Sequence, residues 1–318
     1  MNPLTFGIKL LAACSLVLTA PLHAAPFSFI ALGDMPYGPD ETAGRSYRAL
    51  IEQVNRRAPV FSIHVGDFKS GSTLCSNDDF TRQRKHFDLF DHPVVYTPGD
   101  NEWTDCHRKN NGSYDPIERL TRLREQFFYV DRSLGKRSMP VESQRTAMPL
   151  HGLYIENQRW VHGGSVFITA HIVGSNNNFE ARDPKAVAEF FERDRANIDW
   201  IKDAFRVARE QAAQSVIIAI QADVLVGSNP ANPFGSTSGF KASIGDTLLP
   251  LARDFGRPVL LIHGDSHILQ YDEPFRIGRE PVKNLRRLQV PGASDVRAVR
   301  ITVDPSSNEP FTIQLIRP

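Results

Sequence analysis

The chain has 318 residues, of which 41% are hydrophobic and 23% are charged, and these fractions exclude a disordered or fibrous protein. Its 37 basic and 36 acidic residues give a formal net charge of +1, so no charge excess indicates a nucleic-acid partner or an anionic membrane surface. Three cysteines are too few for a disulfide scaffold or a cysteine-rich zinc module.

The first 24 residues have the organisation of a secretory signal peptide. Lys9 precedes an apolar run that is too short to span a membrane, and the small residue Ala24 precedes the expected cleavage point. A buried N-terminal helix and a lipoprotein cleavage site at Cys14 are the alternatives. Cleavage after Ala24 predicts a periplasmic or secreted protein, in which Cys75 and Cys106 meet an oxidising compartment. No second long apolar segment follows, so we expect no membrane span.

From residue 25 onward, apolar strands alternate with amphipathic helices. Short apolar runs predict strands at residues 27–32, 60–65, 92–96, 159–173, 215–220 and 259–262. Apolar residues at helical spacing predict helices at residues 42–57, 78–90, 116–129, 184–213 and 246–255. The tail is expected to form strands at residues 288–290, 296–303 and 311–316. Continuous apolar strands between helices indicate one α/β domain, residues 25–318, with its sheet covered on both faces. Two long insertions, residues 131–151 and 226–239, are predicted to be loops of the kind that often form lids or binding surfaces.

Four predicted strands end in a glycine and an aspartate at the start of a loop. These segments are Gly33-Asp34, Gly66-Asp67, Gly99-Asp100-Asn101-Glu102 and Gly264-Asp265-Ser266-His267. One such pair is typical of a turn, but four at strand ends favour a common site, because ligands bind beyond the carboxyl ends of parallel strands. Clustered carboxylates are costly to bury without cations. Two metal ions ~3.5–4 Å apart would suit the hydrolysis of a phosphate ester.

The order of these motifs resembles that of the calcineurin-like metallophosphoesterases, the superfamily that includes the purple acid phosphatases. The resemblance covers residues 27–267 and includes Gln221, which follows a strand where the family has a lone histidine. It implies a four-layer αββα sandwich in which the C-terminal strands complete the second sheet. It also implies hydrolysis of a small-molecule phosphate ester by a metal-activated hydroxide.

Carried over residue by residue, the resemblance implies a metal site that departs from the family's pattern. The implied ligands are Asp34, Asp67, Asp100, Asp265, His267 and Gln221. Asp67 corresponds to the ligand that bridges two ions, and Pro36 replaces a histidine ligand of the family. The resulting set is rich in oxygen, which favours Mg²⁺, Mn²⁺ or Ca²⁺ over Fe or Zn ions. One or two divalent ions are expected, because two histidine positions are lost.

Three residues are candidates for catalysis. Asn101 stands where the family has its catalytic histidine, and an amide does not protonate near neutral pH, so we expect a preference for good leaving groups. His107 follows the third motif closely and is a candidate proton donor. His171 ends a predicted strand before an asparagine-rich segment, which either binds phosphate or forms a turn. Lys69 follows the second motif and either meets a phosphate oxygen or is solvated.

The strand order of the family also places the loops of Cys75 and Cys106 side by side. The resemblance therefore implies a disulfide that holds the Asp67 and Asp100 loops together, with two unpaired thiols as the alternative. Two other functions stay open: a degenerate site that binds a metal ion or phosphate in the cell envelope without turnover, and an envelope protein that uses the fold for interactions. The sequence carries no signal for the oligomeric state.

Overall fold

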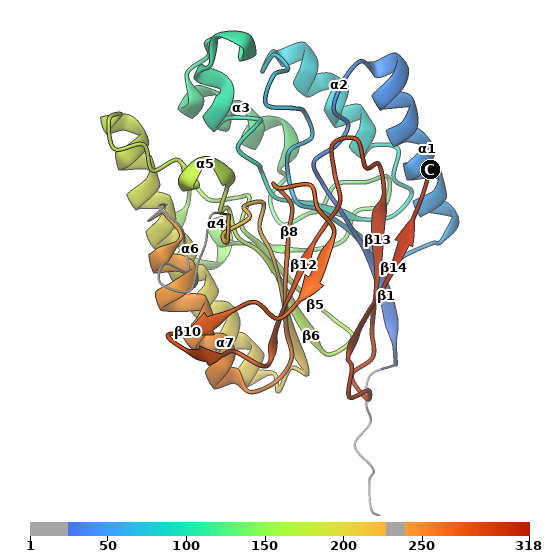
Figure 1. The fold of residues 1–318 in the computed structure, drawn as a ribbon, viewed down its shortest axis with the longest axis vertical. Coiled ribbons are helices and arrows are strands. Elements are labelled where there is room, and N and C mark those ends of the chain that lie inside the picture. Colours follow the sequence, from blue (N-terminus) through green and yellow to red (C-terminus); the bar gives the residue numbers. More distant parts are fainter. Residues whose placement is uncertain (1–24, 227–238) are drawn as a thin grey trace, which may run out of the picture.

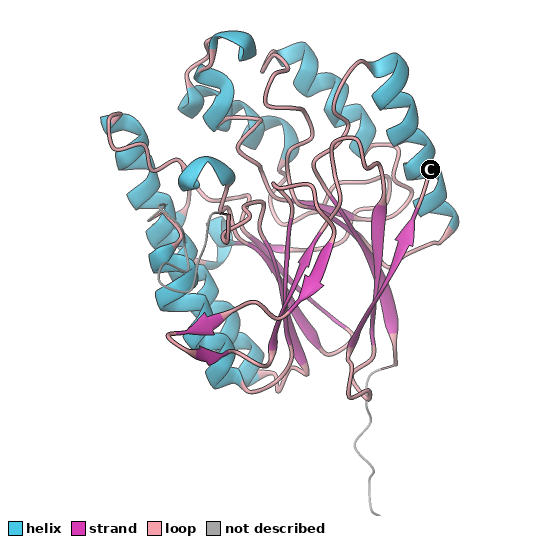
Figure 2. Ribbon diagram, in the orientation of Figure 1, coloured by secondary structure: helices cyan, strands magenta, loops and turns pink. Residues whose placement is uncertain are grey.

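The structure is a computed structural model that describes residues 25–226 and 239–318. Two β-sheets lie face to face, with helices on the outer side of each, as Figures 1 and 2 show. This arrangement confirms the predicted four-layer αββα sandwich. The predicted signal peptide and nearly all of the predicted loop 226–239 lie outside the described residues. Within the described ranges, no helix is long and apolar enough to cross a membrane.

The first sheet has the strand order β14-β13-β1-β2-β3. Its strands are β1 (Phe27–Leu32), β2 (Ser62–His64), β3 (Val94–Tyr96), β13 (Ala298–Val303) and β14 (Phe311–Ile316). The first three run parallel, whereas β13 pairs antiparallel with both β1 and β14. Its outer face is covered by α1 (Arg45–Arg56), α2 (Asn77–Phe87) and α3 (Pro116–Phe127).

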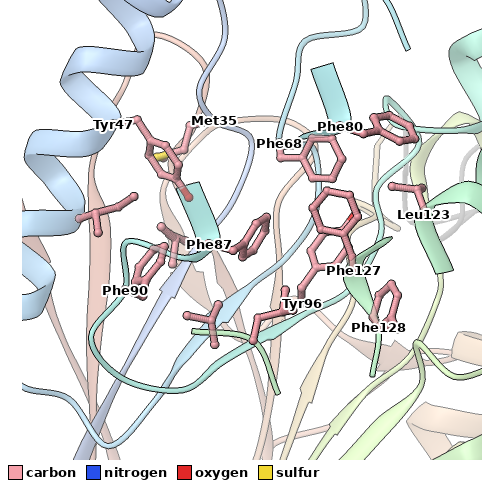
Figure 3. Packing of buried hydrophobic residues seen from close by; sticks show 14 of the residues in the cluster. Met35, Tyr47, Phe68, Phe80, Phe87, Phe90, Tyr96, Leu123, Phe127 and Phe128 are labelled. Atoms are coloured by element: carbon pink, nitrogen blue, oxygen red, sulfur yellow. The ribbon is translucent and has the colours of Figure 1, made fainter. Parts of the chain in front are cut away.

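A cluster of aromatic side chains joins these three helices to the first sheet (Figure 3). The rings of Phe68 and Phe127 stack at 5.0 Å, and Phe87 packs edge-on against Tyr96 at 5.3 Å. Phe68 directly follows Asp67, so this packing fixes the loop after β2. The apolar stripe that predicted a helix over residues 116–129 thus also positions a candidate site loop.

The second sheet has the order β4-β5-β6-β7-β8-β12-β9. Its strands are β4 (Glu142–Ser143), β5 (Gln158–His162), β6 (Ser165–Thr169), β7 (Ser215–Ala219), β8 (Val259–His263), β9 (Gln270–Asp272) and β12 (Leu285–Gln289). Its outer face is covered by α6 (Pro184–Glu210) and α7 (Leu249–Phe255), and β10 (Arg276–Ile277) with β11 (Glu280–Pro281) forms a separate hairpin. Two short helical segments, α4 (Gln144–Ala147) and α5 (Gly174–Asn177), lie in the connections.

The C-terminal strands differ from the expectation. Only β12, with β9, joins the second sheet, whereas β13 and β14 extend the first sheet beside β1. In this position Val299, Ile301 and Val303 of β13 are buried in the core between the sheets. There they share a layer with Phe29 of β1, and the pairing covers the otherwise open edge of that strand.

Candidate functional site at the strand ends

Side chains from the ends of β1, β2, β3 and β8 meet in one place, which we call the acidic cluster. Its members are Asp34, Asp67, Asp100, Asp265 and His267. The Asp265 N–H donates to Asp34 Oδ1 at 2.9 Å, and His267 Nε2 lies 3.5 Å from the same oxygen. Gln221, after β7, joins the remaining two, because its Nε2 lies 3.2 Å from both Asp67 Oδ2 and Asp100 Oδ1. The structure thus brings together all six side chains that the resemblance implied as metal ligands.

Glycines make this convergence possible. A Cβ atom at Gly264 or Gly292 would collide with the Asp34 side chain, and a Cβ at Gly99 would collide with that of Asp67. A Cβ at Gly174 would lie 2.8 Å from Asp100 Oδ2 and 2.9 Å from Asp265 Oδ1. Only residues without a side chain let loops from both sheets approach so closely, which explains the Gly-Asp pattern of the sequence.

Strained backbone is concentrated in the same loops. Asp34, Asp67, Asp265 and His267 have φ values of 54°, 55°, 76° and 62°, in the left-handed region. This conformation costs on the order of 1–2 kcal/mol for a residue with a side chain, although aspartate tolerates it better than most. Such strain gathers at functional sites, where the surrounding structure holds it in place.

Two buried side chains support the Asp67 loop from behind. Glu102 Oε1 accepts hydrogen bonds from the Asp67 N–H, from the Gly99 N–H and from the Tyr96 hydroxyl, at 2.8–2.9 Å. Lys69 is 1% exposed, and its Nζ donates to the Asn101 carbonyl at 2.6 Å. Of the two alternatives for Lys69, solvation is therefore wrong. Its ammonium is a buried positive charge beside the cluster, and burial lowers its pKa.

The electrostatics of the cluster call for a cation. Burial raises the pKa of Asp34, of Asp67 and of Asp265, the last to about 8, and repulsion by neighbouring carboxylates adds to each shift. A hydrogen bond with Asp34 raises the pKa of His267. Asp34 Oδ2 is fully buried and accepts no hydrogen bond from any residue that the structure describes. A buried carboxylate oxygen without a partner is unfavourable unless a proton or a positive charge meets it.

Of the three catalytic candidates, the structure places only Asn101 in the cluster. Asn101 Nδ2 donates to Asp67 Oδ2 at 2.7 Å and to the Tyr37 hydroxyl at 2.8 Å. His171 is fully buried, its Nδ1 lies 2.8 Å from Glu156 Oε1, and burial lowers its pKa to about 4. His107 lines a separate pocket of about 610 Å³ and bonds to a neighbouring backbone carbonyl. In the part of the chain that the structure describes, neither histidine contacts a carboxylate of the cluster.

Two polar residues at the site were missed by the sequence analysis. The Tyr37 hydroxyl donates to Asp67 Oδ2 at 3.1 Å, and no motif of the sequence indicated it. The Ser175 hydroxyl donates to Asp100 Oδ2 at 2.7 Å and lies 3.2 Å from Asp105 Oδ1. The asparagine-rich sequence around Ser175 did indicate one of the two alternatives, a turn. It forms a turn in which residues 175–178 all have left-handed φ values, a conformation that asparagine favours.

The donor set around Asp34 fits a divalent ion better than the set around Asp67. Asp34 has one carboxylate oxygen, Oδ2, without a partner among the described residues, and its Oδ1 lies near the His267 imidazole and the Asp265 N–H, whereas Asp67 is surrounded by hydrogen-bond donors. Among the described residues, no three His, Cys, Asp or Glu side chains stand ready as a metal site. Binding would therefore require rotation of side chains such as His267, which is one-third exposed.

Comparisons with known proteins support the fold. No family model matches the chain, and no curated protein matches it in sequence. A dimetal phosphatase from Danio rerio has a similar structure, with a TM-score of 0.54 and 12% identity over 92% of this chain and 98% of that one. A purple acid phosphatase from yellow lupin has a TM-score of 0.50 and 13% identity over 92% of this chain and 54% of that one. GAP50, an anchor in the inner membrane complex of Plasmodium, has a TM-score of 0.50 and 14% identity over 92% of this chain and 89% of that one. These likenesses show that the chain has the fold of these phosphatases, which confirms the four-layer architecture that the resemblance implied.

Proposed function

We propose that this protein hydrolyses a small-molecule phosphate ester at the acidic cluster with the help of a divalent metal ion. The observation that carries the proposal is the gathering of four carboxylates and His267 at the strand ends of both sheets, with Asp34 Oδ2 buried and unpartnered. Such a concentration of negative charge is a site for a cation and, through the cation, for a phosphate.

The residues around Asp34 are the ones placed to hold the metal ion. Asp34, Asp265 and His267 would hold the ion, with the charges of Asp67 and Asp100 alongside. Oxygen ligands of this kind suit Mg²⁺ or Mn²⁺. When bound, the ion polarises phosphate oxygens and lowers the pKa of a coordinated water.

Two neutral hydrogen-bonding side chains, Ser175 and Asn101, complete the site. The Ser175 hydroxyl is exposed at the rim and bonded to Asp100, so it is placed to donate to a phosphate oxygen instead. The Asn101 amide would orient the phosphate, but it cannot release a proton near neutral pH. We therefore expect activated esters such as p-nitrophenyl phosphate to be hydrolysed faster than alkyl phosphates.

The test is hydrolysis of p-nitrophenyl phosphate by protein stripped with a chelator and reloaded with Mn²⁺. Turnover should depend on the ion, be lost in Asp34→Asn, and persist in Asp254→Asn, which alters an exposed carboxylate far from the strand ends. Binding of Mn²⁺ without turnover of any phosphate ester would favour the alternative function, a metal- or phosphate-binding protein of the cell envelope.

We also propose that the protein acts in the periplasm or outside the cell. The disulfide between Cys75 and Cys106, with a Cα–Cα distance of 5.7 Å, supports an oxidising compartment. Mass spectrometry of the protein from its native host should find an N-terminus at Ala25 or within a few residues of it. An intact Met1 in exported material would contradict the proposed cleavage.

A further inference from the structure

The two halves of the acidic cluster differ in how their carboxylate oxygens are used. Asp67 Oδ2 accepts three hydrogen bonds, from the Tyr37 hydroxyl at 3.1 Å, from Asn101 Nδ2 at 2.7 Å and from Gln221 Nε2 at 3.2 Å. A carboxylate oxygen has about two lone-pair directions, so this atom has none left for an ion. Asp34 Oδ2, in the other half, has no hydrogen-bond partner within residues 25–226 and 239–318.

Gln221 cannot simply turn its amide oxygen toward an ion. Its Oε1 accepts the N–H of Gly174 at 2.6 Å, and its Nε2 faces Asp67 and Asp100 at 3.2 Å each. A flipped amide would set an NH₂ group against the Gly174 N–H and would forfeit that bond. Gln221 is fully buried, so water cannot replace the lost partner.

The donors on the Asp67 side do what a cation would otherwise do there. Two amides and a hydroxyl direct positive hydrogen atoms at Asp67, and the buried Lys69 ammonium lies just behind, bonded to the Asn101 carbonyl at 2.6 Å. A divalent ion between Asp67 and Asp100 would have to displace these donors, and the positive hydrogen atoms of the Gln221 NH₂ group would repel it.

We infer that the acidic cluster takes a single divalent ion, on the Asp34 side, and that the Gln221 amide keeps a second ion out of the space between Asp67 and Asp100. This inference rests on the proposed function only in assuming that an ion binds. It assigns Gln221 as the residue that sets the number of ions, in place of the ligand role that the resemblance implied.

The test compares wild-type protein with Gln221→Glu. Glutamate has the same shape, so one oxygen can still accept the Gly174 N–H, while the other presents a carboxylate oxygen to the gap between Asp67 and Asp100. Mn²⁺ uptake is measured by titration calorimetry and elemental analysis. Electron paramagnetic resonance of the loaded protein distinguishes an isolated Mn²⁺ from two magnetically coupled ions.

We expect wild-type protein to bind about one Mn²⁺ with an uncoupled spectrum, and Gln221→Glu to bind about two with a coupled spectrum, as expected for ions ~3.5–4 Å apart. Gln83→Glu, a matched change of a buried glutamine on α2, should behave like wild type. If Gln221→Glu does not fold, Gln221→His supplies the second variant, with the same expected gain.

Two coupled ions in wild-type protein would overturn the inference, and so would a folded Gln221 variant that gains no ion. Failure of the proposed function gives a different result. Protein that binds one Mn²⁺ but hydrolyses no ester refutes the hydrolase and leaves the ion count intact. Protein that binds no Mn²⁺ until Gln221 is replaced refutes both the metal dependence of the proposed reaction and the inferred ion on the Asp34 side.

Discussion

The molecule buries carboxylates in two regions and treats them in opposite ways. In the first region, Glu156 forms a two-pronged ion pair with Arg124 at 2.6 and 3.0 Å, and Glu189 pairs with Arg193 at 2.5 and 3.0 Å. His171 completes this group, which we call the arginine network. Burial alone would raise the pKa of both glutamates, but the arginines outweigh it and lower both values.

Among the described residues, no arginine bonds to a carboxylate of the acidic cluster, and burial there raises the pKa of Asp34, Asp67 and Asp265. This difference in charge balance separates a region that stabilises the fold from a region that can bind an ion. The arginine network is saturated and supports the site, since Arg193 bonds to Asn177 in the left-handed turn that presents Ser175. The cluster is left short of positive charge, which is the condition under which an ion binds.

The largest expected effect comes from neutralising the cluster. Asp34→Asn keeps the acceptor for the Asp265 N–H but removes the charge and the unpartnered anionic oxygen. We expect kcat/KM for p-nitrophenyl phosphate to fall roughly 10³-fold or more, with Mn²⁺ affinity falling in parallel. The metal-free variant should unfold at the same urea concentration as wild type or higher, because a buried charge is gone. Full activity in Asp34→Asn would remove the distinction between the two regions.

The same change in the arginine network should act on stability instead. Glu156→Gln leaves Arg124 and His171 without their anion, and breaking a buried ion pair costs about 3–5 kcal/mol of unfolding free energy. Glu142→Gln is the matched control, because that glutamate also pairs with an arginine but is half exposed, and should cost less than about 1 kcal/mol. Urea unfolding measures both. Equal losses in the two variants would show that burial does not decide the strength of these pairs.

The disulfide should contribute nearly as much. Cys75–Cys106 closes a loop over a sequence separation of 31 residues, which corresponds to about 3–4 kcal/mol in the chain-entropy description. Both sulfur atoms lie against the Asn101 carbonyl, so the double variant Cys75→Ala, Cys106→Ala should also bind Mn²⁺ more weakly. Two free thiols in denatured, unreduced protein would show that the bond is absent.

The smallest expected effect is a slope of stability with pH. The pKa of Asp265 is raised to about 8 in the folded protein, far above that of an unfolded aspartate. Between pH 6.5 and 8 the folded state therefore holds a proton that the unfolded state releases, and stability must fall as pH rises. The slope is at most about 1.4 kcal/mol per pH unit for this group. Urea titrations in a chelator at several pH values should show it in wild type and a shallower slope in Asp265→Asn, where the raised pKa values of Asp67 and His267 still contribute.

Much of the site was predictable from the sequence for a local reason. Each Gly-Asp stands directly after an apolar strand, and parallel strands bring their carboxyl ends to one edge, so the convergence of Asp34, Asp67 and Asp100 followed from strand order. Asp265 follows β8 of the second sheet and meets them because the two sheets pack face to face. The disulfide followed in the same way, from the order of the loops that carry its cysteines.

Only the tertiary structure decided the features that depend on contacts between distant parts of the chain. The alternation of residues 296–303 identified a half-buried strand, but not that it would pair with β1 rather than extend the second sheet. The sequence made His171 a candidate for catalysis, and only the fold pairs it with Glu156, 15 positions away. The resemblance implied Gln221 as a metal ligand, and only the contact with the Gly174 N–H fixes which end of its amide faces the carboxylates. Residue type states what a side chain can do, while burial and hydrogen-bond partners, which come from distant parts of the chain, decide which of those roles it takes.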